Sequence, residues 1–442
     1  MKPERRWICF PATVLLCIAA NGFVFVPDRP HWWLVLGICS LIANLLPLLT
    51  LSPKNGFRLC ILAHGNSCLR QFIAGVVFSI LFWLGTLPFL SLRTGTQWLI
   101  GLLICIAVLA LTFWNGILCL YFTSVQLGIK LRLIGLLCGW IPIVNIIVLL
   151  RILKVTSKEI SFEAQKKALD RSRRQEKICQ TKYPILLVHG VFFRDTRYFN
   201  YWGRIPSALI TNGATIFYGN HPSAASIADS AQVLAQRIRE IREQTGAEKV
   251  NIIAHSKGGL DCRYAIAFCG IEQDVASLTT INTPHRGCRF ADCLLQKIPH
   301  SVQQQVAHTY NRALSRLGEP EADFMAAVTD LTSSRCSERD ASMPLPQGIF
   351  CQSFGSKLNQ ASGGKFPLNL SYHLVHFFDG SNDGLVGEDS FSWGPNYTLL
   401  TTPHPEGISH GDIIDLNRYN LPDFDVREFY VQLVADLKKR DL

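Results

Sequence analysis

The chain has 442 residues, of which 48% are hydrophobic and only 17% charged, and its formal net charge is +10. Residues 1–150 carry ten Lys/Arg against two Asp/Glu, residues 151–177 carry nine against four, and residues 178–442 carry 24 against 27. Because the excess of basic residues lies outside the long second part, the charge argues against nucleic acid as a partner. The composition also excludes a disordered or collagen-like chain.

Five apolar stretches follow one another in the first part of the chain. They lie at about 8–26, 32–51, 72–92, 98–122 and 133–150. The first four have about the 20 apolar residues that a helix needs to cross the hydrocarbon core of a membrane. Because further stretches follow the first one, we expect it to be a retained anchor and not a cleaved signal peptide. We therefore predict an all-α transmembrane domain over residues 1–150.

The fifth stretch differs from the others because Gly139, Pro142 and Asn145 interrupt its middle. With four spans and the N-terminus inside, 17 Lys/Arg lie on the cytoplasmic side and two outside. With five spans, neither orientation gives better than 11 against eight. The positive-inside rule therefore favours four spans, with residues 133–150 as a re-entrant or interfacial helix. The domain that follows is then expected on the cytoplasmic side of the cell membrane.

A basic, amphiphilic connector covers residues 151–180 and is predicted to be helical. It is either a solvated linker helix or a helix that lies on anionic lipid headgroups. A Lys or Arg close to such a surface contributes about 1 kcal/mol.

Strands and helices alternate from Tyr183 onwards. Short apolar segments expected as strands lie at 185–190, 215–219, 250–255 and 277–282, and helices are expected at 226–244 and 257–268. This alternation predicts an α/β fold with a mostly parallel sheet over residues 181–442. The polar, irregular residues 286–372 are expected to supply helices over the site, and a lid is one candidate among them.

A candidate nucleophile stands at the end of the third predicted strand, in the sequence AHSKGG of residues 254–259. It matches a nucleophile elbow in which Ala254 replaces the first Gly of GxSxG. A sharp turn from strand to helix needs small residues beside the serine, and alanine is still small. The turn would lift the Ser256 hydroxyl above the sheet, close to the positive end of the following helix.

The acid and the base should follow the nucleophile in the order Asp/Glu, then His. Asp383 lies on the Gly-rich segment GSNDGLVG, and His410 follows in ISHGDIID. We expect His410 to accept the serine proton and Asp383 to orient its ring and stabilise the imidazolium. Asp379 and Asp389 are alternatives for the acid, and His404 is the alternative for the base.

Acyl transfer also requires two backbone N–H groups that point at the developing oxyanion. One is expected from Lys257, directly after the nucleophile, and the other from Val191, in the loop after the first strand. We expect His189, His255 and His285 to pack or to fix loops, and not to act as bases.

The motifs ILLVHG, VNIIAHSKGGLDCRYA, INTPHRG, NDGLV and SHGD occur in this order and together resemble those of bacterial triacylglycerol lipases, especially the Firmicute-type branch. The ending PDFDVREFYVQL is similar to the C-terminal helix of those enzymes. The resemblance covers most of residues 183–435 and implies an α/β-hydrolase fold. It does not extend to the apolar first part.

The resemblance also implies a structural calcium ion near the loop of the catalytic histidine. Asp412 and Asn417 match two oxygen ligands of that site, although Asn417 replaces the usual carboxylate, and calcium prefers such hard ligands. No cofactor is expected to be required for catalysis. The 15 cysteines show no CxxC spacing, and we expect free thiols in a reducing setting.

These features together predict a membrane-anchored serine hydrolase of acyl esters, with lipids as substrates. A phospholipid or lipid-anchor deacylase, or an acyltransferase, would use the same triad. A transporter or scaffold with a degenerate hydrolase domain is the non-enzymatic alternative. The first part lacks the intramembrane acidic residues that mark many transport paths, which argues against it.

Overall fold

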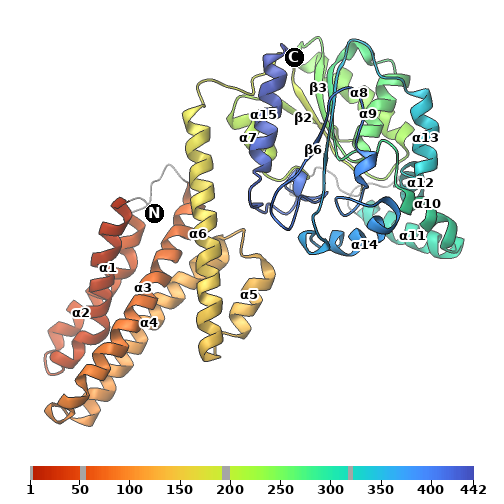
Figure 1. Cartoon of the computed structure of the whole chain (residues 1–442). Coiled ribbons are helices and arrows are strands. Elements are labelled where there is room, and N and C mark those ends of the chain that lie inside the picture. The colour runs from red at the N-terminus through yellow and green to blue at the C-terminus, as the bar shows by residue number, and fades with distance from the viewer. Residues whose placement is uncertain (1–2, 50–55, 192–199, 317–321) are drawn as a thin grey trace. The chain divides into compact units, whose positions relative to one another are not determined.

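The computed structural model describes residues 3–49, 56–191, 200–316 and 322–442 (Figure 1). The chain divides into two units, Met1–Arg171 and Ser172–Leu442. The boundary between the units lies inside the predicted connector, at the end of a long helix.

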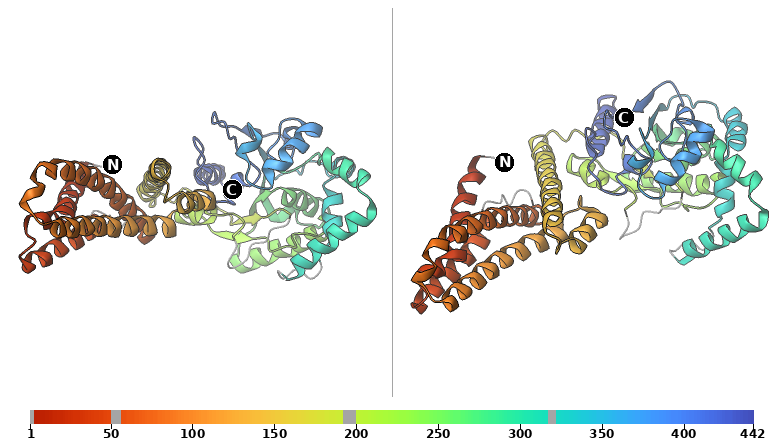
Figure 2. Two further views of the ribbon diagram at one scale, coloured as in Figure 1. Left: turned by 90° about the horizontal axis from the view of Figure 1, so that it is seen from below. Right: turned by 60° about the horizontal axis from the view of Figure 1, so that its bottom comes forward.

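The first unit is helical. Its α-helices are α1 Pro3–Asn21, α2 Pro30–Leu49, α3 Phe57–Thr86, α4 Gly95–Thr123, α5 Gly128–Leu137 and α6 Pro142–Ser172, with 3₁₀ turns at Gly22–Phe25 and Leu87–Leu92. Helix α1 packs on α2, and the long helices α3 and α4 run side by side (Figure 2).

Within the part of the chain that the structure describes, three helices are long and apolar enough to cross a membrane. They cover His31–Leu48, Phe57–Phe89 and Gly95–Thr123. The first predicted span appears instead as a shorter apolar helix, Phe10–Phe25. Its regular α-helical part ends at Asn21, whose side chain donates to the carbonyl of Cys17 and to the hydroxyl of Ser79.

Helix α3 begins at Phe57, well before the apolar stretch that the sequence indicated at residue 72. Two polar side chains in its first half are hydrogen-bonded to α6. Asn66 Nδ2 donates to Thr156 Oγ1 over 2.8 Å, and Arg70 Nη2 donates to Ser157 Oγ over 2.9 Å. Pairing of this kind explains why polar residues continue the helix where a loop was expected.

The predicted helix over 133–150 is not a single element. Helix α5 ends at Leu137, and α6 begins at Pro142 and continues without a break to Ser172. Proline is suited to the first turn of a helix because its missing N–H has no acceptor there. The exposed face of α6 is apolar up to Leu150 and carries basic residues from Arg151 onwards. Its relation to a membrane stays a prediction.

The second unit is built on a six-stranded sheet. Its strands are β1 Ile185–Val188, β2 Ile216–Tyr218, β3 Val250–His255, β4 Val275–Ile281, β5 Phe350–Ser356 and β6 Tyr397–Leu400. They are all parallel, in the order β2-β1-β3-β4-β5-β6. The predicted α/β class with a parallel sheet is confirmed, although β5 and β6 were not predicted.

Helices cover both faces of the sheet because its strands are apolar on both sides. Along β1, Ile185 and Leu187 face the cluster that includes α7 (Ile205–Thr211) and α15 (Val426–Lys439). Leu186 and Val188 face the opposite cluster, with α8 (Ile227–Thr245) and α9 (Lys257–Phe268). Figure 1 shows these two helix pairs on the two sides of the strands.

The segment between β4 and β5 is helical, as the sequence led us to expect. It contains α10 Arg289–Lys297, α11 His300–Arg316, α12 Phe324–Asp330 and α13 Ser333–Ser342, and α14 Leu368–Asp379 follows β5. Short 3₁₀ turns lie at Glu272–Asp274, Ala361–Gly363, Glu388–Ser390 and Asp412–Ile414.

Candidate active site

Ser256 connects strand β3 directly to helix α9 in a strained backbone conformation. Its φ is 55° and its ψ is −133°, which a residue other than glycine rarely adopts. The second and third residues after Ser256 have no room for a side chain. A Cβ atom on Gly258 would collide with the carbonyl oxygen of His189, and one on Gly259 with the side chain of Thr283. These contacts hold the serine in the geometry of a nucleophile elbow.

The structure brings Ser256, His410 and Asp383 together in one line of hydrogen bonds. His410 Nε2 lies 3.0 Å from Ser256 Oγ, and His410 Nδ1 lies 2.6 Å from Asp383 Oδ2. All three residues are buried, with exposed fractions of 6%, 7% and 0%. The hydroxyl can therefore donate to an imidazole whose other nitrogen donates to a carboxylate, the arrangement that nucleophilic catalysis by serine requires.

The Asp383 carboxylate is fixed by donors on both oxygens. Oδ1 accepts from the backbone N–H groups of Leu385 and Val386 over 2.9 and 2.8 Å. Oδ2 accepts from His410 and also from Asn282 Nδ2, which lies 2.6 Å away. Asn282 was not among the predicted site residues, although it lies in the motif INTPHRG at the end of β4.

The alternative acids and the alternative base make other contacts. Asp379 lies 3.9 Å from Arg289, and burial raises the pKa of its carboxyl group above the ordinary value. The backbone carbonyl of Asp389 accepts from Arg286. His404 Nδ1 accepts from the backbone N–H of Glu406. None of these contacts involves Ser256 or His410.

The end of β1 lies directly beside Ser256. A Cβ atom on Gly190 would lie 2.7 Å from Ser256 Cβ, so only glycine fits this position. His189 Nδ1 lies 2.9 Å from the carbonyl oxygen of Gly190, and its ring stacks on that of His221 at 4.0 Å. Because a peptide group is planar and trans, this bond also sets the direction of the Val191 N–H. The loop beyond Val191, residues 192–199, lies outside the described residues.

Lys257 is the first residue of α9, so its N–H belongs to the helix turn that has no acceptor within the helix. Its side chain is 1% exposed and turns inward. Lys257 Nζ donates to Asp261 Oδ1 over 2.7 Å and to Ser230 Oγ over 3.1 Å. These bonds tie the residue after the nucleophile to α8 and to the next turn of α9.

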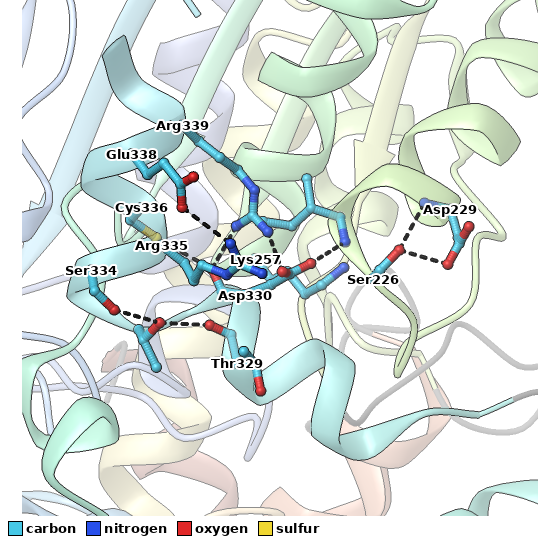
Figure 3. Close-up of polar contacts among 12 residues, drawn as sticks. Ser226, Asp229, Lys257, Thr329, Asp330, Ser334, Arg335, Cys336, Glu338 and Arg339 are labelled. Carbon is cyan, nitrogen blue, oxygen red and sulfur yellow. Dashed lines mark hydrogen bonds and ion pairs between the residues drawn. The ribbon is translucent and has the colours of Figure 1, made fainter. Parts of the chain in front are cut away.

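Burial raises the pKa of Asp261 to about 6, and the charge of Lys257 opposes that shift. His221 Nε2 lies 3.6 Å from Asp261 Oδ2 on the other side. A second ion pair, between Asp330 and Arg339, joins α12 to α13 nearby, and Figure 3 shows it with Lys257 labelled in the same view. Two ion pairs, Lys257–Asp261 and Asp330–Arg339, therefore lie near the turn at Ser256. The sequence alone did not indicate them.

The other two histidines that the sequence placed in packing roles are buried and neutral. Burial lowers the pKa of both His255 and His285 well below the ordinary value. His255 Nδ1 lies 2.6 Å from the hydroxyl of Tyr201. His285 Nε2 lies 3.0 Å from Thr280 Oγ1, and its ring stacks on Trp393.

The two residues suggested as calcium ligands differ in burial. Asp412 is buried and accepts from the hydroxyl and the backbone N–H of Ser409, while Asn417 is exposed. Among the described residues, no group of three or more His, Cys, Asp or Glu side chains could hold a metal ion. The calcium site stays a prediction.

Known proteins are similar to part of this chain. Residues 184–319 match the family described as palmitoyl protein thioesterase. Triacylglycerol lipase 2 of Saccharomyces cerevisiae is 41% identical over 285 residues, which cover 56% of this chain and 77% of the yeast protein. The triacylglycerol lipase of Vibrio cholerae is 30% identical over 246 residues, covering 50% of this chain and 77% of that protein. The chain belongs to the lipase/esterase family.

The share of each relative that this chain covers differs from one lipase/esterase to another. The chain spans only about half the length of two further bacterial triacylglycerol lipases, 54% of one and 49% of the other. Among solved structures, the mature lipase of Bacillus licheniformis aligns at 24% identity and a TM-score of 0.43, over 57% of this chain and 92% of that one. The narrower Firmicute-type branch stays a prediction.

The ion pair beneath the elbow leads to a test of stability. We expect Lys257→Met to lower the thermal midpoint by roughly 10 °C, because breaking a buried pair costs about 3–5 kcal/mol. The double variant Lys257→Met/Asp261→Asn should recover most of this loss, since it removes both charges of the pair and leaves neither one buried without its partner.

The deficit of Lys257→Met should depend on pH. Lys257 lowers the pKa of Asp261, so without Lys257 the folded variant takes up this proton at a higher pH than the folded wild type does. The stability gap between variant and wild type should therefore narrow as the pH falls towards about 6, where the wild-type carboxyl group is protonated as well. The difference in thermal midpoint between Lys257→Met and wild type is measured on the full-length proteins in detergent, at pH 5 and at pH 7. A double variant as unstable as the single one would contradict the assignment.

Proposed function

We propose that the chain is a serine hydrolase that cleaves acyl esters of lipids through an acyl-enzyme, with Ser256 as nucleophile, His410 as base and Asp383 as the orienting acid. The observation that carries this proposal is the unbroken line of two hydrogen bonds, 3.0 Å and 2.6 Å long, from the Ser256 hydroxyl through His410 to Asp383. Membership of the lipase/esterase family supports it.

In the proposed reaction, Ser256 Oγ attacks the acyl carbonyl carbon while His410 Nε2 accepts the hydroxyl proton. The negative charge on the carbonyl oxygen is stabilised by the N–H groups of Lys257 and Val191. The tetrahedral intermediate then expels the alcohol, which takes the proton from His410, and leaves the acyl group on Ser256. Water repeats the sequence, with His410 as base again, and releases the carboxylic acid.

Two observations bear on the bond that is cleaved. The curated relatives are triacylglycerol lipases, which favours oxygen esters of lipids. The match of residues 184–319 to the palmitoyl protein thioesterase family favours a second candidate, removal of an acyl group from a thioester, as in a lipid-anchor deacylase. The same triad would serve both, since only the leaving group differs.

We further propose that the apolar helices anchor the hydrolase in the cell membrane, with the catalytic unit on the cytoplasmic side. The three helices of sufficient length and apolarity support the anchor. The distribution of Lys and Arg supports the orientation, because 17 of them lie on the cytoplasmic side when the shorter apolar helix Phe10–Phe25 also crosses the membrane as a fourth span. An anchored domain meets lipid substrates at high effective concentration.

The nucleophile assignment predicts that a fluorophosphonate labels wild-type protein at Ser256. Ser256→Ala should abolish labelling and lower the hydrolytic rate at least ~10³-fold, because the remaining groups cannot form the acyl-enzyme. The measurement is turnover of the detergent-solubilised protein on oxygen esters and thioesters of increasing chain length. Full labelling of the alanine variant would contradict the assignment.

The acid assignment predicts unequal effects of three substitutions. Asp383→Asn should keep the fold but cost up to ~10⁴-fold in rate, because the amide no longer favours the working His410 tautomer or its charged form. Asp379→Asn and Asp389→Asn serve as matched controls and should cost far less. A large loss of hydrolytic rate in Asp379→Asn, without one in Asp383→Asn, would contradict the assignment of Asp383 as the acid.

The orientation predicts which positions a membrane-impermeant maleimide reaches in intact cells. In a variant cleared of native thiols, a single cysteine replaces either Gly95 or Ser172, both of which are exposed. The reagent should label position 95 and spare position 172 until the cells are permeabilised. Labelling at 172 in intact cells would place the catalytic unit on the outer face.

We propose that hydrolysis needs no metal ion, because Ser256, His410 and the two backbone N–H groups supply the nucleophile, the proton transfers and the oxyanion donors. Dialysis of the protein against a calcium chelator should therefore leave kcat unchanged. The thermal midpoint of the dialysed protein should also stay the same if Asp412 and Asn417 hold no ion. A loss of activity that calcium alone restores would revive the calcium site.

A further inference from the structure

Gly190 is a conformationally free residue at a position where the backbone must be held in one conformation. It separates β1 from Val191, whose N–H is a proposed oxyanion donor, and it lies too close to Ser256 to carry a side chain. Glycine gains conformational freedom from its missing Cβ, so hydrogen bonds must hold its peptide groups in place.

The two peptide groups that flank Gly190 are held from opposite sides. His189 Nδ1 donates to the Gly190 carbonyl, in the peptide group that also contains the Val191 N–H. The Gly190 N–H, in the preceding peptide group, donates to the hydroxyl oxygen of Tyr201 over 3.0 Å. Tyr201 is 4% exposed and lies next to the buried Trp202. Tyr201 lies outside β1 in the sequence, so this hydrogen bond joins two separate segments of the chain.

The hydroxyl of Tyr201 also contacts the residue before the nucleophile, since it lies 2.6 Å from His255 Nδ1. A backbone N–H only donates, so the Tyr201 oxygen accepts from Gly190. The contact with His255 Nδ1 joins the two side chains whichever of the two atoms carries the proton. Burial together with the nearby His410 lowers the pKa of His255.

We propose that Tyr201 is a positioning residue for the oxyanion site: its hydroxyl bridges Gly190 to His255 and so fixes the Val191 N–H relative to Ser256. This inference rests on the proposed function. Tyr201 does not need to touch the substrate, because it acts through the orientation of the peptide groups on either side of Gly190.

The test is Tyr201→Phe, which removes the hydroxyl and keeps the buried ring. Full-length protein in detergent is assayed on 4-nitrophenyl butyrate, with active sites counted by the nitrophenolate that a 4-nitrophenyl phosphonate releases. We expect kcat per active site to fall about 10- to 100-fold with KM within roughly threefold. That is less than the loss of an oxyanion donor itself, which costs about 10²–10³-fold.

A readout specific to the oxyanion site accompanies the rate. An acyl trifluoromethyl ketone forms a tetrahedral adduct on the serine, so its inhibition constant should rise by the same factor as kcat/KM falls. The matched control is Tyr430→Phe. Tyr430 is fully buried at 5.9 Å from Trp202, and its hydroxyl has no hydrogen-bond partner among the described residues. This control should behave as wild type.

The outcomes separate this inference from the proposed function. Wild-type turnover that Ser256→Ala abolishes, with Tyr201→Phe equal to wild type, would overturn the role of Tyr201 alone. A Tyr201→Phe protein without titratable sites would make Tyr201 a folding residue and would also overturn it. Absence of wild-type turnover on all esters and thioesters would overturn the proposed function, and this inference with it.

Discussion

The backbone of Ser256 imposes the constraint on which the rest of the site depends. Its φ of 55° is a conformation that costs about 1–3 kcal/mol for a residue with a side chain. The Ser256 N–H donates to Ile281 O across the sheet, and the Gly259 N–H donates to Ser256 O. Gly190 and Gly258 allow β1 to approach closely. The strain is tolerated because three chain segments meet at one residue.

Buried polar groups hold the side chains around Ser256 in one geometry. Asp383 is fully buried, yet four donors reach its carboxylate, so the cost of removing it from water is offset by hydrogen bonds. Beneath the elbow, the Lys257 ammonium is paired with Asp261 in the same way. Both arrangements specify one geometry, because a misaligned partner would leave a buried charge without compensation.

The sequence revealed the parts of this site that are local along the chain. The strand β3, the serine turn and helix α9 are contiguous, and Asp383 and His410 lie on recognisable Gly-containing loops. Tyr201, Asn282 and Asp261 were missed because their roles arise only when separate segments meet in three dimensions. The same reason explains the early start of α3 at Phe57, where partners on α6 satisfy polar side chains that were expected in a loop.

The central claim is that Ser256 carries the acyl group during turnover. Rapid mixing with a radiolabelled acyl ester, acid quenching and proteolysis would locate the label directly. The account predicts one acyl group per chain on the peptide that contains Ser256, formed in a burst before steady-state turnover and absent from Ser256→Ala. Label on another residue, or steady turnover with no covalent acyl group in a burst, would contradict it.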